Sequence, residues 1–192
     1  MTLHDAYRRC EEITAAEAKN FSYGIRLLPR PKRQAMSALY ALARRIDDIG
    51  DGDGPAAAKL EALAGVHRDI DALGHGEAPA ADAVLVAMAD VASRYPLPLS
   101  SLHALVEGCE WDVKGTSYET FDHLVAYCRR VAGTVGRLSL AVYGCADPGK
   151  AGDLADDLGV ALQVTNILRD VVEDHRDMGR VYLPAVPATR RQ

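Results

Sequence analysis

Two pairs of aspartates, each with a spacing of four residues, are the strongest chemical signal in this sequence. The first pair is Asp47 and Asp51, and the second is Asp170 and Asp174. A spacing of four places both carboxylates of a pair on one face of a helix. Clustered carboxylates repel one another, and Mg²⁺, which prefers oxygen ligands and is often shared with a substrate phosphate, removes that repulsion. The spacing therefore predicts a magnesium site that receives a phosphorylated substrate.

Each aspartate pair has polar companions on the same predicted helix face. Tyr40 and Arg44 precede the first pair at helical spacing, and the Arg44 guanidinium is suited to grip a phosphate. Gln163 and Asn166 precede the second pair in the same way, beside a strongly apolar flank. Two such faces turned toward each other would form one anionic cavity able to hold several Mg²⁺ ions and a diphosphate.

Each aspartate pair taken alone could instead be a solvated helix end. A calcium-binding loop that starts at Asp51 is disfavoured, because Pro55 stands at its fifth position and Ala62, rather than a glutamate, at its twelfth. The repetition of the same spacing, with polar companions both times, favours the metal site.

Several other residues admit structural and functional interpretations. Gly133 and Gly136 favour close packing of helices slightly more than contact with a ligand. Tyr127 suits a core position and a cavity wall equally, and Trp111 is expected in the core. The histidines share no spacing and are expected at the surface.

Composition narrows the class of protein. A chain of 192 residues with 48% hydrophobic and 26% charged residues can bury a core and predicts one globular domain. The net charge of -5, without a basic stripe, argues against a nucleic-acid partner. The four cysteines form no C-x-x-C pair, which favours free thiols in a reducing cytoplasm. No signal peptide or long apolar segment is recognised, so we expect a cytoplasmic protein, with peripheral membrane contact left open.

The pattern of residues predicts an all-α fold. Alanine- and leucine-rich segments are separated by glycine and proline, and runs of β-branched residues are scarce. We expect one helical domain over residues 1–184 and an irregular tail at 185–192. The predicted helices fall within residues 2–19, 20–28, 34–49, 56–73, 80–94, 100–114, 121–143 and 148–174.

Five motifs, together with the two D-x-x-x-D pairs, resemble the squalene/phytoene synthase family, the head-to-head isoprenyl diphosphate synthases. The similarity runs from about Tyr7 to Pro184. The motifs are NFSY with LLP at 20–29, ALYA at 38–41, RRIDDIGD at 44–51, YCRRVAGTVG at 127–136 and LQVTNILRD at 162–170.

The resemblance implies an isoprenoid-synthase-type helical bundle with a central cavity, whose last helices we expect to be missing from this chain. It implies that Asp47, Asp51, Asp170 and Asp174 hold Mg²⁺ bridged to substrate diphosphates. The implied roles of the remaining positions are contact with the diphosphates for Arg44, Asn166 and Arg169, contact with the reacting carbons for Tyr40 and Tyr127, and lining of the cavity for Val131, Gly136 and Gln163.

The implied activity is a prenyltransferase that joins two prenyl diphosphates head to head through a cyclopropyl intermediate. Segments 20–29 and 108–116 resemble bacterial presqualene diphosphate synthases of hopanoid pathways, so two farnesyl diphosphates are the first expectation. Phytoene synthesis from geranylgeranyl diphosphate, as in carotenoid pathways, is the alternative. An inactive helical fragment is a further alternative, and a terpene cyclase is disfavoured by the D-x-x-x-D form. Mg²⁺ is the implied cofactor, and NADPH is not expected for the first half-reaction.

Overall fold

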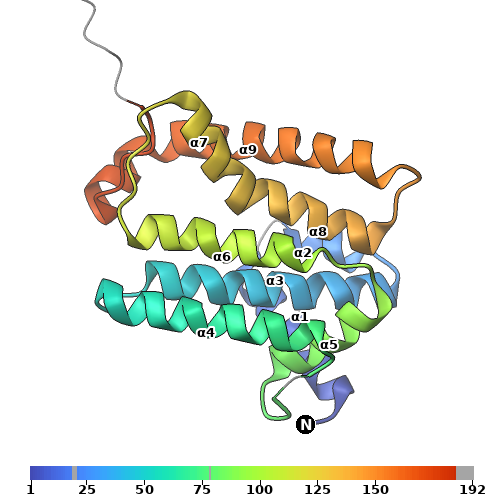
Figure 1. The fold of residues 1–192 in the computed structure, drawn as a ribbon. Helices are drawn as coiled ribbons and strands as arrows, with labels where there is room; N and C mark the ends of the chain where they lie inside the picture. Colours follow the sequence, from blue (N-terminus) through green and yellow to red (C-terminus); the bar gives the residue numbers. More distant parts are fainter. Residues whose placement is uncertain (19–20, 78, 185–192) are drawn as a thin grey trace, which may run out of the picture.

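Glycine and proline set most of the helix boundaries in the computed structural model, which describes residues 1–18, 21–77 and 79–184 (Figure 1). These residues contain no β-strand, which confirms the predicted all-α fold. The tail predicted at 185–192 lies outside the described residues. The elements are α1 (Leu3–Glu17), α2 (Phe21–Arg26), α3 (Arg30–Asp51), α4 (Ala56–Gly74), α5 (Ala83–Arg94), α6 (Leu99–Val113), α7 (Phe121–Cys128), the π-helical turn η1 (Arg129–Gly133), α8 (Thr134–Tyr143) and α9 (Pro148–Met178).

Side-chain caps and glycines explain where several helices begin and end. The Asp82 carboxylate accepts hydrogen bonds from the first backbone N–H groups of α5, and Asp147 does the same for α9. Helix α9 ends at Met178, and the following Gly179 has a left-handed φ of 65°, which favours glycine. This end lies four residues beyond the predicted one at 174, which places Asp174 inside the helix.

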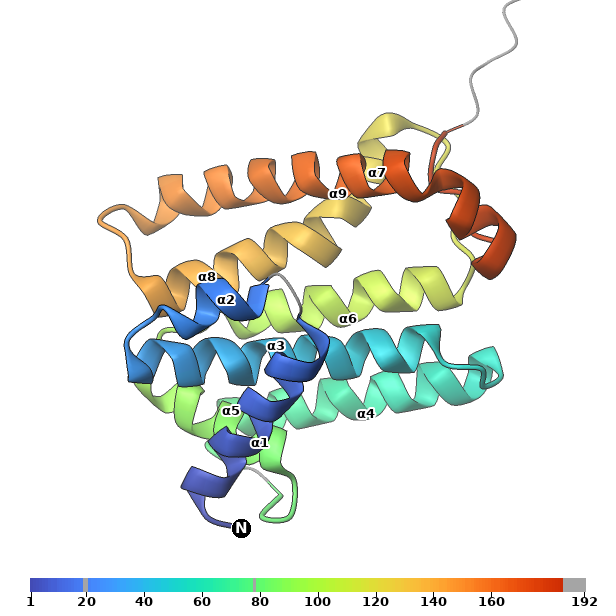
Figure 2. The same ribbon diagram turned by 180° about the vertical axis from the view of Figure 1, so that it is seen from behind.

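Helix α3 is central, and it packs against α1, α4, α5, α6 and α8. Figures 1 and 2 show α3, α6, α8 and α9 stacked in that order, with α9 farthest from α3. The main core lies around α3 and is made of aliphatic side chains such as Leu42, Ile46, Leu63 and Met88. All four cysteines are free, as the sequence predicts, and none of the described helices is long and apolar enough to cross a bilayer.

A second, smaller core joins α7 to α9. Its fully buried members are Tyr118, Leu124, Tyr127, Cys128 and Ile167. Trp111 of α6 packs against it, so the expectation of a core tryptophan is met by a half-buried ring. This second core fixes the end of α9 that carries the aspartate pair.

Helix α9 touches η1 backbone to backbone. A Cβ atom placed on Gly159 would lie only 2.5 Å from the Gly133 nitrogen, so no larger residue fits there without a shift. On Gly136, an added Cβ would lie 3.0 Å from the Ala155 Cβ. The glycines of the V-A-G-T-V-G segment therefore allow close packing of helices, which is the structural interpretation given to them above. The single helix predicted over 121–143 is interrupted here by the π-helical turn.

One face of α9 remains exposed along its length. Leucines recur on it every fourth residue, and the face continues toward the aspartates as far as Val172, whose side chain is 72% exposed. This exposed apolar face comprises Leu154, Leu158, Leu162, Leu168 and Val172.

Replacing Gly159 by alanine should destabilise the protein by about 1–3 kcal/mol, because the new methyl group collides with the backbone of η1. Urea unfolding would measure the loss. The matched control is Gly65→Ala in α4, where the nearest atom lies 3.7 Å away and the higher helix propensity of alanine should add about 0.5–1 kcal/mol. Equal stability gains in the two variants would show that α9 does not approach η1 this closely.

Candidate active site

The first aspartate pair lies at the C-terminal end of α3. Asp51 is the last residue of the helix, and Asp47 lies one turn earlier. Crowding by protein raises the pKa of Asp47 to about 6, and the negative charge of Asp51 adds to the rise. The Asp47 side chain nevertheless remains accessible to solvent. The Cys109 thiol of α6 lies 3.7 Å from the Asp47 carboxylate and donates toward it.

The second aspartate pair lies on α9, and both of its side chains are half-buried. Asp170 accepts two hydrogen bonds from the neighbouring Arg169, from Nε at 2.7 Å and from Nη2 at 2.5 Å, and these bonds lower the pKa of Asp170. Burial and the charge of Asp170 raise the pKa of Asp174, and Asp51 adds to this rise. The charge of Asp51 at the end of α3 therefore acts on Asp174 of α9.

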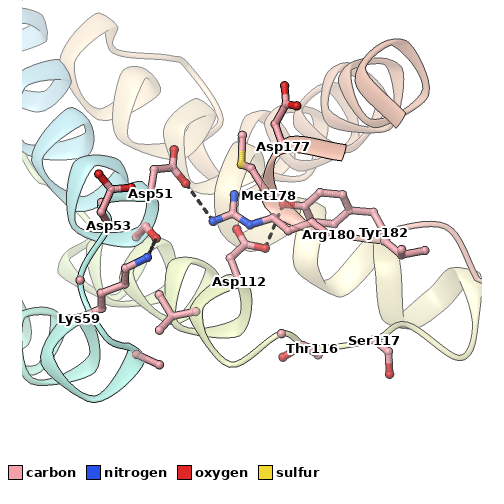
Figure 3. Close-up of a pocket in the computed structure, with 18 residues that line it drawn as sticks. Asp51, Asp53, Lys59, Asp112, Thr116, Ser117, Asp177, Met178, Arg180 and Tyr182 are labelled. Carbon is pink, nitrogen blue, oxygen red and sulfur yellow. Dashed lines mark hydrogen bonds and ion pairs between the residues drawn. The ribbon is translucent and has the colours of Figure 1, made fainter. Parts of the chain in front are cut away.

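Arg180, just beyond the end of α9, connects the two helices. Its Nη2 donates to Asp51 Oδ1 at 2.9 Å, and its side chain is only 19% exposed (Figure 3). Burial alone would lower the pKa of Arg180, but Tyr182 and Asp112, together with Asp51, raise it. A permanently charged guanidinium thus lies among the carboxylates, where it offsets part of their repulsion.

Asp112 of α6 is held by two tyrosines. Tyr127 donates to its Oδ2 at 2.8 Å and Tyr182 donates to its Oδ1 at 3.1 Å. Burial raises the pKa of Asp112, while Arg180 and the Tyr127 hydroxyl act in the opposite direction. The Tyr118 ring packs on both tyrosine rings, and its buried hydroxyl has no hydrogen-bond partner in the described part of the chain. Tyr127 therefore belongs to the second core through its ring and reaches the site through its hydroxyl.

Each aspartate of the first pair lines a different cavity. A polar pocket of about 620 Å³ includes Asp51, Asp112 and Arg180 in its walls, together with Lys59, which donates to the Gly50 carbonyl at 3.0 Å (Figure 3). An apolar cavity of about 530 Å³ lies between α2, α3, α6 and α8 and includes Asp47 in its wall. The other lining residues of the apolar cavity include Tyr40, Leu39, Leu102, Leu105 and Leu138. The arrangement suits a ligand with an anionic head and a hydrocarbon tail.

The other predicted site residues differ in what they contact. Arg44 forms an ion pair at 2.8 Å with Asp48 rather than with Asp47 or Asp51, although its charge still lowers the pKa of Asp47. Val131 packs against the second core, and Gly136 lies against α9. The side chains of Gln163, which is half-buried, and Asn166, which is exposed, form no hydrogen bond with another described residue. Roles for these residues at the substrate stay predictions.

The donor set fits Mg²⁺ as a shared ion rather than as an ion enclosed by protein. Among the described residues, no three His, Cys, Asp or Glu side chains converge closely enough to hold a metal ion by themselves. The pairs instead present carboxylates at Asp47 and Asp174 whose pKa values are raised chiefly by burial, and further by the charge of the other aspartate of each pair. Mg²⁺ usually takes one or two carboxylates and completes its octahedron with water and substrate phosphates. The site therefore fits the ion when a diphosphate is present.

Sequence reasoning missed Arg180, Asp112, Tyr182 and Cys109. Each acts on a residue of another helix, so no spacing within one helix reveals it. The only local signal was the placement of Arg180 and Tyr182 directly after the glycine that ends α9.

Comparison with known proteins supplies the context for this geometry. The sequence model described as squalene/phytoene synthase matches residues 14–190. Phytoene synthases of Mycobacterium bovis and Mycobacterium tuberculosis are each 46% identical over 182 residues, which cover 95% of this chain and 58% of theirs. A phytoene synthase of Arthrospira platensis is 41% identical, with 62% of its length covered. The chain thus spans about three-fifths of the length of these relatives.

Solved structures agree with the sequence matches. A dehydrosqualene synthase in complex with a ligand superposes with a TM-score of 0.86 at 33% identity, over 95% of this chain and 62% of that one. Squalene synthase HpnC from Alicyclobacillus acidocaldarius also gives 0.86, at 31% identity and with 67% of its chain covered. These superpositions confirm the predicted isoprenoid-synthase fold.

Replacing Asp47 by asparagine should raise the melting temperature of the metal-free protein at pH 8 and have a smaller effect at pH 5. The raised pKa means that the folded state binds the Asp47 proton more tightly than the unfolded state does. The ionised carboxylate is therefore destabilising above pH 6, and this penalty fades as pH falls from 6 toward the ordinary value of 3.8. Thermal melts between pH 5 and 8 would measure the difference.

The control is Asp48→Asn, which removes one charge from the same helix but breaks the ion pair with Arg44. It should give no stabilisation at any pH in this range. A pH-independent effect of Asp47→Asn would contradict the electrostatic account.

Proposed function

The chain belongs to the squalene/phytoene synthase family, and we propose that it binds two prenyl diphosphates and condenses them head to head. The observation that supports this proposal most strongly is that Asp51 lines a polar pocket while Asp47, one helical turn away, lines an apolar cavity. A diphosphate fits the polar side, and a prenyl chain fits the apolar side. The aspartates lie between them, next to the carbon–oxygen bond that must break.

The polar side has the groups needed to receive a diphosphate. Mg²⁺ held by Asp47, Asp51, Asp170 and Asp174 would neutralise the substrate's negative charge and favour departure of the diphosphate. Arg180 already lies among these carboxylates, and its planar guanidinium can bind phosphate oxygens through two parallel hydrogen bonds. We expect Arg180 to exchange its contact with Asp51 for one with the diphosphate when substrate binds.

The apolar side protects the cationic stage of the reaction. When the carbon–oxygen bond of one substrate breaks, diphosphate leaves with the electron pair and an allylic cation remains. The double bond of the second substrate attacks this cation, and loss of a proton closes the cyclopropane ring. Leucine side chains of α3, α6 and α8 exclude water that would quench the cation, and the Tyr40 ring in the same wall can stabilise its charge.

The comparisons favour the longer substrate. The relatives at 46% and 41% identity are named phytoene synthases, whereas the dehydrosqualene and squalene synthase structures are 33% and 31% identical. We therefore propose geranylgeranyl diphosphate as the substrate, which was the alternative in the sequence analysis, in preference to farnesyl diphosphate. Farnesyl diphosphate remains the second candidate because both of these superpositions reach a TM-score of 0.86.

Incubation with Mg²⁺ and either geranylgeranyl or farnesyl diphosphate, followed by extraction of the lipids, tests this assignment. The chain should be assayed alone and also as an extended protein, in which the unmatched portion of the phytoene synthase that is 46% identical is added to it. We expect the extended protein to convert geranylgeranyl diphosphate to a C40 product faster than it consumes farnesyl diphosphate. If the extended protein is folded and the lipid extract contains nothing but unreacted substrate, the head-to-head activity is refuted.

Asp51→Asn and Asp174→Asn should each lower kcat of the extended protein by roughly 100-fold or more, because each removes a ligand that stabilises charge on the leaving diphosphate. Asp53→Asn is the matched control: Asp53 lines the same polar pocket but belongs to neither pair. Losses of the same size in all three variants would point to a general effect of pocket charge instead of metal ligation.

A further inference from the structure

Two histidines from different helices meet outside the candidate active site. His67 of α4 and His103 of α6 have their Nδ1 atoms 2.7 Å apart, and their rings meet edge to edge through these atoms, with centroids 5.0 Å apart and planes inclined by 13°. Both side chains are about three-quarters buried, with 26% and 28% exposed. Neither residue lines the polar pocket or the apolar cavity.

A carboxylate faces the other nitrogen of each ring. His103 Nε2 lies 3.2 Å from Asp71 Oδ1, and His67 Nε2 lies 3.6 Å from Glu110 Oε1. The second oxygen of Glu110 accepts a hydrogen bond from Lys114 Nζ at 2.7 Å. Since a carboxylate accepts hydrogen bonds, it favours the tautomer that carries its proton on Nε2.

This tautomer creates a conflict between the two rings. If both rings carry their protons on Nε2, both Nδ1 atoms present lone pairs to each other at hydrogen-bond distance. Two facing lone pairs repel, so the contact at 2.7 Å requires either a proton on one Nδ1, donated to the other ring, or a metal ion bound by both rings.

The carboxylates favour the metal ion. Histidines that bind metals almost always donate their second ring N–H to a carboxylate or carbonyl, which orients the ring and strengthens it as a ligand. His103 has this support from Asp71 of α4 at 3.2 Å, and Glu110 of α6 faces His67 Nε2 at 3.6 Å, just beyond hydrogen-bond distance. We infer that His67 and His103 form a two-histidine site for a divalent transition-metal ion of the Zn²⁺, Ni²⁺ or Cu²⁺ type, distinct from the aspartate site.

The rings must separate and tilt to hold such an ion. Metal–nitrogen bonds of about 2.0–2.1 Å in a tetrahedral site separate two ligand nitrogens by a little over 3 Å. The rings must therefore move apart by well under 1 Å, and because their Nδ1 atoms face each other head-on, each ring must also tilt until both lone pairs point at one ion. Partly exposed side chains can make both movements. No third His, Cys, Asp or Glu converges on this point in the part of the chain that the structure describes, so water completes the coordination. Imidazole ligands also select against Mg²⁺, which prefers oxygen.

An ion bound here would join α4 to α6. Helix α4 follows the loop after Asp51, and α6 carries Cys109 and Asp112 into the candidate active site. Binding should therefore stabilise the folded frame around that site, because the two ligands are brought together only in the folded state.

Thermal unfolding of the chain at pH 7.5, with Ni²⁺ added in the presence of excess Mg²⁺, tests the site without any assay of activity. We expect a saturable rise in Tm of about 5 °C when free Ni²⁺ exceeds Kd a hundredfold. His103→Asn should abolish the rise. The matched control His4→Asn replaces an exposed histidine on α1 and should preserve it.

Paramagnetic broadening of the histidine side-chain NMR signals in the unmodified chain gives a second measurement that does not depend on a variant folding. Substoichiometric Ni²⁺ should broaden the signals of His67 and His103 before those of the other histidines. An equal Tm rise in His103→Asn, or uniform broadening of all histidines, would overturn the proposal. Absence of any Ni²⁺ effect would also overturn the proposal and would indicate that a proton, rather than a metal ion, joins the two rings.

Discussion

The close contact between α9 and the π-helical turn governs the geometry of the candidate site. Because Gly133 and Gly159 lack side chains, α9 lies directly on the backbone of η1, and the charge of Asp51 at the end of α3 reaches Asp174 on α9. Bulkier residues would separate α9 from η1 and widen the distance between the two aspartate pairs. A feature that contributes no chemical group of its own thus sets how far apart the two pairs lie.

The site is electrostatically demanding in the absence of ligands. Asp47, Asp112 and Asp174 all have raised pKa values, chiefly because protein replaces water around them. The chain compensates locally, with the Arg180 guanidinium on Asp51 and two tyrosine hydroxyls on Asp112. Binding sites are often regions in which the unliganded protein tolerates such repulsion, since the ligand then removes it on arrival. The polar pocket and the apolar cavity place this repulsion at the point where a charged head would meet a hydrocarbon tail.

Sequence patterns predicted what depends on one helix at a time. Glycine and proline marked most helix limits, and the spacing of four identified both aspartate pairs. Contacts between helices were beyond reach, because the partners of Asp51, Asp47 and His67 lie far away in the chain. The π-helical turn was missed for a related reason, since its residues have ordinary helix propensity. The choice between farnesyl and geranylgeranyl chains could not be made from motifs that both enzyme types share.

The exposed apolar face of α9 has a practical consequence for work with this polypeptide. Hydrophobic association strengthens as water is warmed from refrigeration toward body temperature and weakens again on cooling. Helix α9 exposes more than half of the surface of leucines such as Leu154, Leu158 and Leu162. The isolated chain should therefore self-associate more strongly at body temperature than at refrigeration temperature. Expression at low temperature, followed by purification on ice, is therefore the handling that its surface calls for.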